Sequence, residues 1–121
     1  MSDGKTTAPQ TEEDRKLAAA LKARDGSALA ELYDRYGAVV YALALKVVRV
    51  PGDAEEVTQE VFLYAWEKAS MFDAARGSLM NWLCTMARSR GIDRLRKTKS
   101  QVRRVEAMER LQPVMDRVER G

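Results

Sequence analysis

The chain has 121 residues, of which 45% are hydrophobic and 32% are charged, and its formal net charge is +3. This length suits one domain with a single hydrophobic core, and the composition is typical of amphipathic helices. Because the chain lacks histidine and has only one cysteine, Cys84, the sequence excludes Cys/His zinc sites, Ser-His-Asp and Cys-His nucleophile arrangements, and an internal disulfide.

The N-terminal part is polar and leads into a first helix. Residues 1–10 have the composition of a disordered lead-in and contain no signal peptide. No apolar run is long enough to cross a bilayer, so we expect a cytoplasmic protein without membrane insertion. Thr11 can cap a helix three residues before Asp14, which predicts a helix over residues 12–24.

A second, longer helix is expected from Ala28 to Arg49. Residues 25–27 end the first helix with a glycine, and Ser27 can cap the next one. Apolar residues then recur at spacings of three and four, which indicates a core helix. They are Leu29, Leu32, Tyr33, Tyr36, Val40, Leu43 and Val47. Gly37 interrupts this pattern, either for a close approach of two helices or for a kink.

Residues 50–53 read Val-Pro-Gly-Asp and form the clearest break in the chain. Proline cannot continue the second helix, and Asp53 can cap the third, with Glu56 completing a capping box. We therefore predict a third helix from Ala54 to about Ala69.

This third helix is apolar on more than one side. Its inward stripe is Val57, Val61, Tyr64 and Ala65, its surplus apolar residues are Phe62, Leu63 and Trp66, and its polar face carries Glu56, Gln59, Glu60 and Glu67. Surplus aromatic residues beside an acidic edge indicate a docking surface, unless neighbouring helices cover Phe62 and Trp66.

A loop and a fourth helix follow. Residues 72–78 have the composition of an ordered loop that ends in a helix cap. A buried stripe then begins at Leu79 and continues with Trp82, Leu83 and Met86, and the helix becomes cationic towards its end. Residues 88–104 hold eight basic residues and one acidic residue, a net charge of +7, so the rest of the chain carries −4. This distribution indicates contact with a polyanion, although a solvated helix with a basic tail fits it as well.

The loop could recognise a nucleotide base. Asp73, Arg76, Ser78 and the backbone around Gly77 offer donors and acceptors that suit a base edge. The apolar residues nearby, which are Met71, Phe72 and Trp82, can wall a pocket, unless Phe72 and Trp82 belong to the core. Such a pocket takes an unstacked base, because a duplex covers those edges and faces.

Three sequence blocks now resemble a known family. They read D-A-E-E-V-T-Q-E-V-F-L-Y-A-W, F-D-A-A-R-G-S-L-M-N-W-L and A-R-S-R-G-I-D-R-L-R-K, with A-L-A-E-L-Y-D-R-Y-G-A-V-V-Y upstream. In this order and spacing they resemble region two of bacterial extracytoplasmic-function (ECF) sigma factors, over roughly residues 27–99.

The resemblance implies an all-α, compact bundle of about four helices without catalysis or cofactor. It implies binding to the clamp helices of the largest subunit of core RNA polymerase through Glu56, Gln59, Glu60, Phe62, Leu63 and Trp66. It also implies opening of the promoter minus-ten element by capture of single-stranded nontemplate DNA. The matching DNA-binding residues are Asp73, Ala74, Arg76, Gly77, Ser78, Asn81, Arg88, Ser89, Arg90, Arg94, Arg96 and Lys97. An anti-sigma factor is a further expected partner.

Two features depart from the family pattern. Ser89 stands where many members have asparagine, which puts its base contact in doubt. Residues 11–99 correspond to region two, whereas residues 100–121 read as a basic linker or as the start of a missing second domain, with a weak amphipathic helix that Pro113 cuts short. The domain that reads the minus-thirty-five element is not found, so the sequence is either a fragment, which its linker-like end favours, or an unusual single-domain member.

Three other functions were weighed. One is a helical adaptor without DNA function, whose basic end only aids solubility. A carboxylate metal enzyme would use Glu55, Glu56 and Glu60, but no second helix supplies matching inward carboxylates. A helix-turn-helix reader of duplex DNA needs a tighter turn than residues 71–78 provide.

Overall fold

The computed structural model describes residues 12–120, and every secondary-structure element among these residues is a helix. The elements in order are α1 (Glu12–Lys22), α2 (Gly26–Val48), α3 (Pro51–Glu67), the short 3-10 helices η1 (Ala69–Met71) and η2 (Ala74–Arg76), and α4 (Leu79–Arg120). The expected all-α fold is confirmed. The disordered lead-in expected for residues 1–10 and the cap expected at Thr11 lie outside the described residues.

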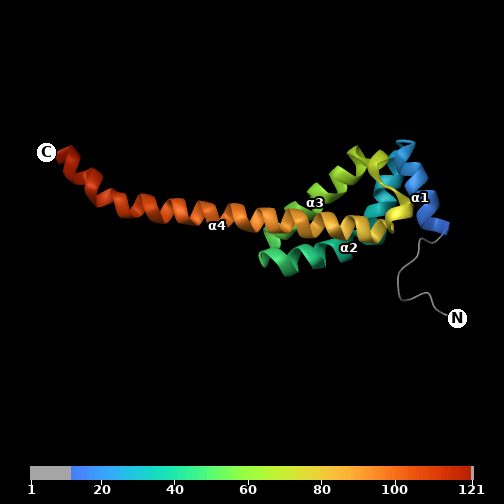
Figure 1. Ribbon diagram of the computed structural model, residues 1–121, viewed down its shortest axis with the longest axis horizontal. Coiled ribbons are helices and arrows are strands. Elements are labelled where there is room, and N and C mark those ends of the chain that lie inside the picture. The colour runs from blue at the N-terminus through green and yellow to red at the C-terminus, as the bar shows by residue number, and fades with distance from the viewer. Residues whose placement is uncertain (1–11, 121) are drawn as a thin grey trace.

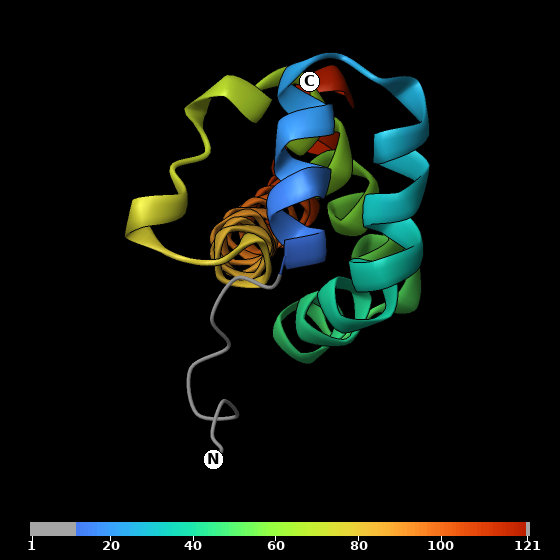
Figure 2. The same cartoon turned by 90° about the vertical axis from the view of Figure 1, so that its right-hand side faces the viewer.

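The helix bundle lies at the N-terminal end of α4. Figure 1 shows α1, α2 and α3 around the first part of α4, while the rest of α4 extends far beyond them. Figure 2, which looks along α4, shows the segment between α3 and α4 standing to one side of the bundle. This segment contains η1 and η2, so the loop predicted to hold a base is placed beside the start of α4.

The core joins all four helices. Its largest fully buried side chains are Leu21, Leu32, Val40, Val57, Val61, Leu79 and Leu83. Burying a side chain of this size stabilises the fold by about 1.5–3 kcal/mol relative to exposing it. The predicted stripes of the third and fourth helices are thereby confirmed for Val57, Val61, Leu79 and Leu83.

The turn between α1 and α2 differs from its prediction. Arg24, rather than Gly26, adopts the left-handed conformation with a φ of 66°. Asp25 is the N-cap, since its carboxylate accepts a hydrogen bond from the Ser27 backbone N–H at 3.0 Å. The cap predicted at Ser27 is therefore wrong, because the carboxylate two residues earlier already satisfies a free N–H and α2 begins at Gly26.

The start of α3 also differs from its prediction. Val50 is the N-cap without a side-chain hydrogen bond, and Pro51 is the first helical residue. Proline is suited to this position because its missing N–H has no helical partner there in any case. Asp53 therefore lies inside the first turn, and its carboxylate accepts a hydrogen bond from Arg94 at 3.1 Å instead of capping α3. The helix ends at Glu67, and Ala69 belongs to η1.

Two glycines have different spatial roles. Figure 2 shows α2 changing direction along its length, and Gly37 lies near the middle of this helix. The atoms nearest to a β-carbon added at Gly37 would belong to the Tyr33 side chain of α2 itself, so the kink fits better than a close approach of two helices. The close approach of two helices occurs at Gly91 of α4 instead. A β-carbon added there would lie 3.0 Å from Cγ1 of Val47 on α2, so a larger residue would require Val47 or α4 to shift.

The C-terminal half of α4 is longer than predicted. The helix continues to Arg120 with Pro113 inside it, so the expectation that Pro113 cuts it short is wrong. Proline disturbs a helix through a lost hydrogen bond and a clash one turn earlier, and bending can relieve that clash. Figure 1 shows α4 changing direction towards its C-terminal end. Side chains over residues 101–120 are exposed, except for the half-buried Asp116, so no packing opposes such a bend. None of the helices described is long and apolar enough to span a membrane.

A buried carboxylate fastens α1 to α2. Asp14 is 6% exposed and accepts hydrogen bonds from the Tyr36 hydroxyl at 2.7 Å and from the Arg35 guanidinium at 3.2 Å. Burial of Tyr36 and its hydrogen bond to Asp14 raise the pKa of the phenol to about 12.

This raised pKa predicts a loss of stability in alkali. An unfolded tyrosine titrates at about pH 10, so the contribution is complete below that pH and is lost as the pH rises to about 12. Tyr36→Phe should be less stable by about 1 kcal/mol at neutral pH, because it lacks the hydrogen bond to Asp14. The difference in urea midpoint between the unaltered chain and this variant should close between about pH 10 and 12. A difference that stays constant over this range would contradict the prediction.

Candidate polymerase and nucleic-acid surfaces

The exposed face of α3 carries most of the residues expected to dock a partner. Glu56, Gln59 and Glu60 are exposed, and Leu63 is 55% exposed. Trp66 is half-buried, because the Arg24 guanidinium lies over its ring at 4.2 Å. We call these five residues, Glu56, Gln59, Glu60, Leu63 and Trp66, the α3 ridge.

Phe62 does not belong to this exposed face. It is 4% exposed, and its ring packs against Tyr33 of α2 with centroids 5.0 Å apart. The expected exposure of Phe62 is therefore wrong, because α2 approaches the side of α3 on which this ring lies. Leu63, one position further, remains outside that contact.

The same approach of α2 to α3 leaves an apolar groove that the sequence did not reveal. Its volume is about 540 Å³. It is lined by Gly26, Leu29, Ala30, Tyr33, Asp34, Gln59, Phe62 and Leu63. The helical spacing predicts that Tyr33 belongs to the core, yet Tyr33 is 51% exposed. Helical spacing identifies the apolar side of a helix but not how exposed each side chain is. A tyrosine on that side can pack its ring against a core residue and still remain partly exposed.

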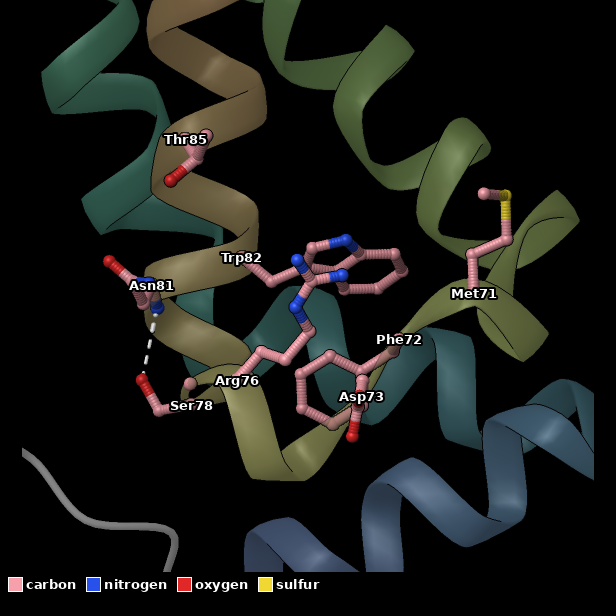
Figure 3. Close-up of a pocket in the computed structure, with 9 residues that line it drawn as sticks. Met71, Phe72, Asp73, Arg76, Ser78, Asn81, Trp82 and Thr85 are labelled. Atoms are coloured by element: carbon pink, nitrogen blue, oxygen red, sulfur yellow. Dashed lines mark hydrogen bonds between the residues drawn. The ribbon is translucent and has the colours of Figure 1, made fainter.

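The loop between α3 and α4 forms a second concave site (Figure 3), which we call the loop pocket. Its volume is about 240 Å³. It is lined by Met71, Phe72, Asp73, Arg76, Gly77, Ser78, Asn81, Trp82 and Thr85. Ligand pockets for drug-sized molecules measure about 300–1,000 Å³, so this one suits a single base. The site confirms that the predicted loop residues come together, and it adds Thr85, while Ala74 is exposed in η2 outside the lining.

Local hydrogen bonds fix the shape of this loop. Asp73 accepts a hydrogen bond from the Ala75 N–H at 3.0 Å and so caps η2. Ser78 accepts a hydrogen bond from the Asn81 N–H at 3.1 Å, which confirms the predicted cap of the fourth helix. Gly77 has a φ of 155°, and an added β-carbon would lie 3.0 Å from Asn81 Nδ2. A residue other than glycine would therefore strain the loop.

The aromatic wall has one buried and one accessible member. Phe72 is 5% exposed and belongs to the core, whereas Trp82 is half-buried and faces the pocket. Their ring centroids are 5.2 Å apart, so Phe72 packs against Trp82. Figure 3 shows Arg76 extending from the loop towards Trp82. The pocket therefore offers an apolar surface for stacking next to a guanidinium donor.

The cations of α4 fall into two groups. Arg88, Arg96 and Lys97 are exposed, as is Ser89 between them in the sequence. Arg90 and Arg94 instead turn towards α3. Arg94 binds Glu56 and Asp53, with a distance of 3.1 Å to Asp53. Arg90 lies 3.9 Å from Glu60, and its guanidinium is 4.9 Å from the ring centroid of Tyr64.

These ion pairs neutralise charges where α3 packs against α4. The hydrogen bond that the Arg94 guanidinium donates to the Glu56 carboxylate raises the pKa of Arg94 above its ordinary value. The sequence suggested Glu56 and Glu60 as possible metal ligands. In the structure their carboxylates form ion pairs with the guanidinium groups of Arg94 and Arg90 instead. In the part of the chain that the structure describes, no group of three acidic or cysteine side chains could hold a metal ion.

The family model described as sigma-70 region 2 matches residues 32–101. The ECF RNA polymerase sigma factor SigK of Mycobacterium tuberculosis is 49% identical over 72 residues, which are 60% of this chain and 38% of that protein. SigK of Mycobacterium bovis matches equally, and SigK of Mycolicibacterium vanbaalenii is 45% identical over 73 residues, 60% of this chain and 37% of that protein. The chain thus spans less than two fifths of the length of these relatives.

Proposed function

The chain belongs to the sigma-70 region 2 family, as its three sequence blocks indicated, and we propose that it acts in transcription initiation as an ECF sigma factor does. In this proposal it binds core RNA polymerase and captures a base of the nontemplate strand at the promoter minus-ten element. The observation that carries the proposal is the open loop pocket, walled by Trp82, next to the cationic face of α4.

The polymerase contact is assigned to the α3 ridge. A docking surface needs apolar area that is exposed before binding and polar groups around it that set the orientation. Leu63 and the groove beside it supply the apolar area, and Glu56, Gln59 and Glu60 supply the polar groups. The proposed partner is the pair of clamp helices of the largest polymerase subunit.

The DNA contact is assigned to the loop pocket and α4. Arg88, Arg96 and Lys97 are exposed cations that can neutralise phosphates, which positions a strand without reading its sequence. A base that leaves the stack can lie against Trp82, with Asp73, Arg76 and Asn81 near its edge. Capture of that base favours the single-stranded state and so helps to open the duplex.

The remaining parts of the proposal follow from this assignment. The protein would have no catalytic reaction of its own, since polymerase performs the chemistry, and it would work in the cytoplasm where polymerase meets the chromosome. An anti-sigma factor that covers the α3 ridge or α4 would hold it inactive. Residues 11–99 would act as the region two domain, and residues 100–121 would lead away from it as a linker.

The proposal is tested by DNA binding of the complex with core polymerase. Fluorescent minus-ten oligonucleotides, as nontemplate single strand and as duplex, are titrated with core polymerase alone and with the complex. We expect the complex to prefer the single strand. Phosphate contacts at Arg88, Arg96 and Lys97 would give a log–log salt slope of about −2. Absence of a complex with polymerase would favour the adaptor alternative, and a preference for duplex would favour a helix-turn-helix reader.

A further inference from the structure

The far part of α4 carries an apolar stripe that no other segment of the described chain covers. Four of its residues follow the i, i+3, i+4, i+7 spacing of a single helix face, and they are between 44% and 73% exposed. We call these residues, Leu111, Val114, Met115 and Val118, the tail stripe. Pro113 lies on the opposite face of the helix, so its ring does not interrupt the stripe. Helices gain most of their stability from packing such a face, so the stripe indicates a docking helix.

The bundle carries an apolar groove on its surface. The groove of about 540 Å³ between α2 and α3 continues into a second one of about 460 Å³, because Tyr33 and Gln59 line both. We call the two together the α2–α3 groove. Along α3 it extends from Glu55 to Leu63, which is about 12 Å by the rise of an α-helix. The tail stripe is about 11 Å long by the same measure, so its length matches the groove.

The charges beside the two surfaces are opposite. Arg110 and Arg117 each precede a residue of the tail stripe by one position, so they flank the stripe on one side. Asp34 lines the groove on α2 and Glu55 lines it on α3, and both are exposed. Among the residues that the structure describes, none of these four side chains forms an ion pair. The acidic lining therefore favours a docking helix that is both apolar and basic, which the tail is.

The tail does not reach the groove of its own chain. α4 is one helix from Leu79 to Arg120, and Figure 1 shows its C-terminal part leading away from α2 and α3. A second copy presents the same tail without this constraint.

We propose that the tail stripe of one copy docks in the α2–α3 groove of another, as an amphipathic helix binds in an apolar groove. Because each copy has one tail and one groove, two copies can make this contact twice and so form a closed pair. The inference goes beyond the proposed function, since it requires neither polymerase nor DNA.

Sedimentation of the purified chain from micromolar to millimolar concentration tests the self-association. Each contact depends on four anchors, so we expect the unaltered chain to shift from monomer to dimer within this range. Leu111→Asp with Met115→Asp places carboxylates in the tail stripe and should raise the Kd at least about 100-fold. The control Val102→Asp with Val105→Asp adds the same charges at similarly exposed residues on other faces of the tail. It should associate like the unaltered chain.

Variants of the groove identify the surface that receives the tail. Ala30→Asp with Leu63→Asp changes two exposed lining residues and should also raise the Kd at least about 100-fold. A second variant, Asp34→Arg with Glu55→Arg, keeps the apolar lining and should raise the Kd about tenfold, because it repels the tail arginines.

A mixture of two defective chains gives the sharpest test. The variant with an altered tail retains an intact groove, and the variant with an altered groove retains an intact tail. Each alone should be monomeric, whereas the mixture should form a one-to-one complex at the upper end of the concentration range. A mixture that stays monomeric would overturn the inference, as would an unaltered chain that is monomeric throughout.

Other occupants of the two surfaces would give different results. If both groove variants associated like the unaltered chain, the tails would pair with each other and the inference would be wrong. Failure of the proposed function is a separate result, namely a polymerase complex that does not form or does not prefer single strands.

Discussion

Replacing Gln59 and Leu63 together with alanine should weaken binding to core polymerase by at least about 100-fold, equivalent to about 3 kcal/mol. Leu63 is 55% exposed beside the apolar groove, and Gln59 lines that groove and the neighbouring one along α2. Both side chains therefore lose water only when a partner covers them. Neither is buried, so their truncation leaves the core intact. Co-purification with core polymerase, followed by competition for core against an unaltered sigma factor, measures the loss.

A matched pair on the far half of α4 controls for loss of exposed area. Gln101 is exposed and Leu111 is 51% exposed, so Gln101→Ala with Leu111→Ala removes the same two residue types at similar exposure. This control should bind polymerase within about twofold of the unaltered chain, because neither residue lies near the α3 ridge. If the variant with Gln59 and Leu63 replaced co-purified with polymerase as well as the unaltered chain, and had the same thermal midpoint, the α3 ridge would not be part of the interface.

Phe62 shows why the sequence could not define this surface completely. Helical spacing placed Phe62, Leu63 and Trp66 together as surplus apolar residues. The pattern does not show which of the three is exposed. The position of α2 decides the matter, since it covers Phe62 with Tyr33 and leaves Leu63 outside. Phe62→Ala would cost about 3–5 kcal/mol of stability through a core cavity, so its effect on polymerase binding would not report on docking.

Features determined by neighbouring residues were predicted well. The cap at Ser78 and the convergence of loop residues on a pocket depend on a stretch from Met71 to Thr85, and local composition was enough to find them. The contacts that join distant segments were not predictable in this way. Arg94 binds Asp53 across 41 positions, and Arg24 lies over Trp66 across 42. Such pairs follow from how helices pack, which a single sequence with many charges does not specify.

The caps illustrate a related limit. Ser27 and Asp53 are both good capping residues, yet the structure uses Asp25 and Val50 as N-caps. Each helix has several candidate starts within a few residues, and the energies that separate them are only about 1 kcal/mol. At Asp53 the cap competes with a guanidinium from α4, and the ion pair with Arg94 is the contact that forms.

Replacing Arg76 with alanine should reduce the rate of promoter opening at least tenfold, while binding to core polymerase stays within about twofold. Arg76 is exposed in η2 and lines the loop pocket with Trp82, but no hydrogen bond from its side chain supports the described fold. Its loss would remove a donor that meets the captured base only after the duplex opens. Permanganate reactivity of minus-ten thymines in the polymerase complex measures opening, and co-purification measures binding.

Ser78 has to be tested through two substitutions, because it shapes the loop as well as lining the pocket. Ser78→Ala would remove the cap of α4, at a cost of about 1 kcal/mol, and could disturb the pocket indirectly. Ser78→Thr retains the hydroxyl that accepts the Asn81 N–H, so it should keep the loop shape and most of the opening activity. If Arg76→Ala lowered opening and polymerase binding equally, the loop would be part of the polymerase contact. Selective loss of opening would instead place Arg76 on the DNA, because only the DNA step requires an unstacked base in the pocket.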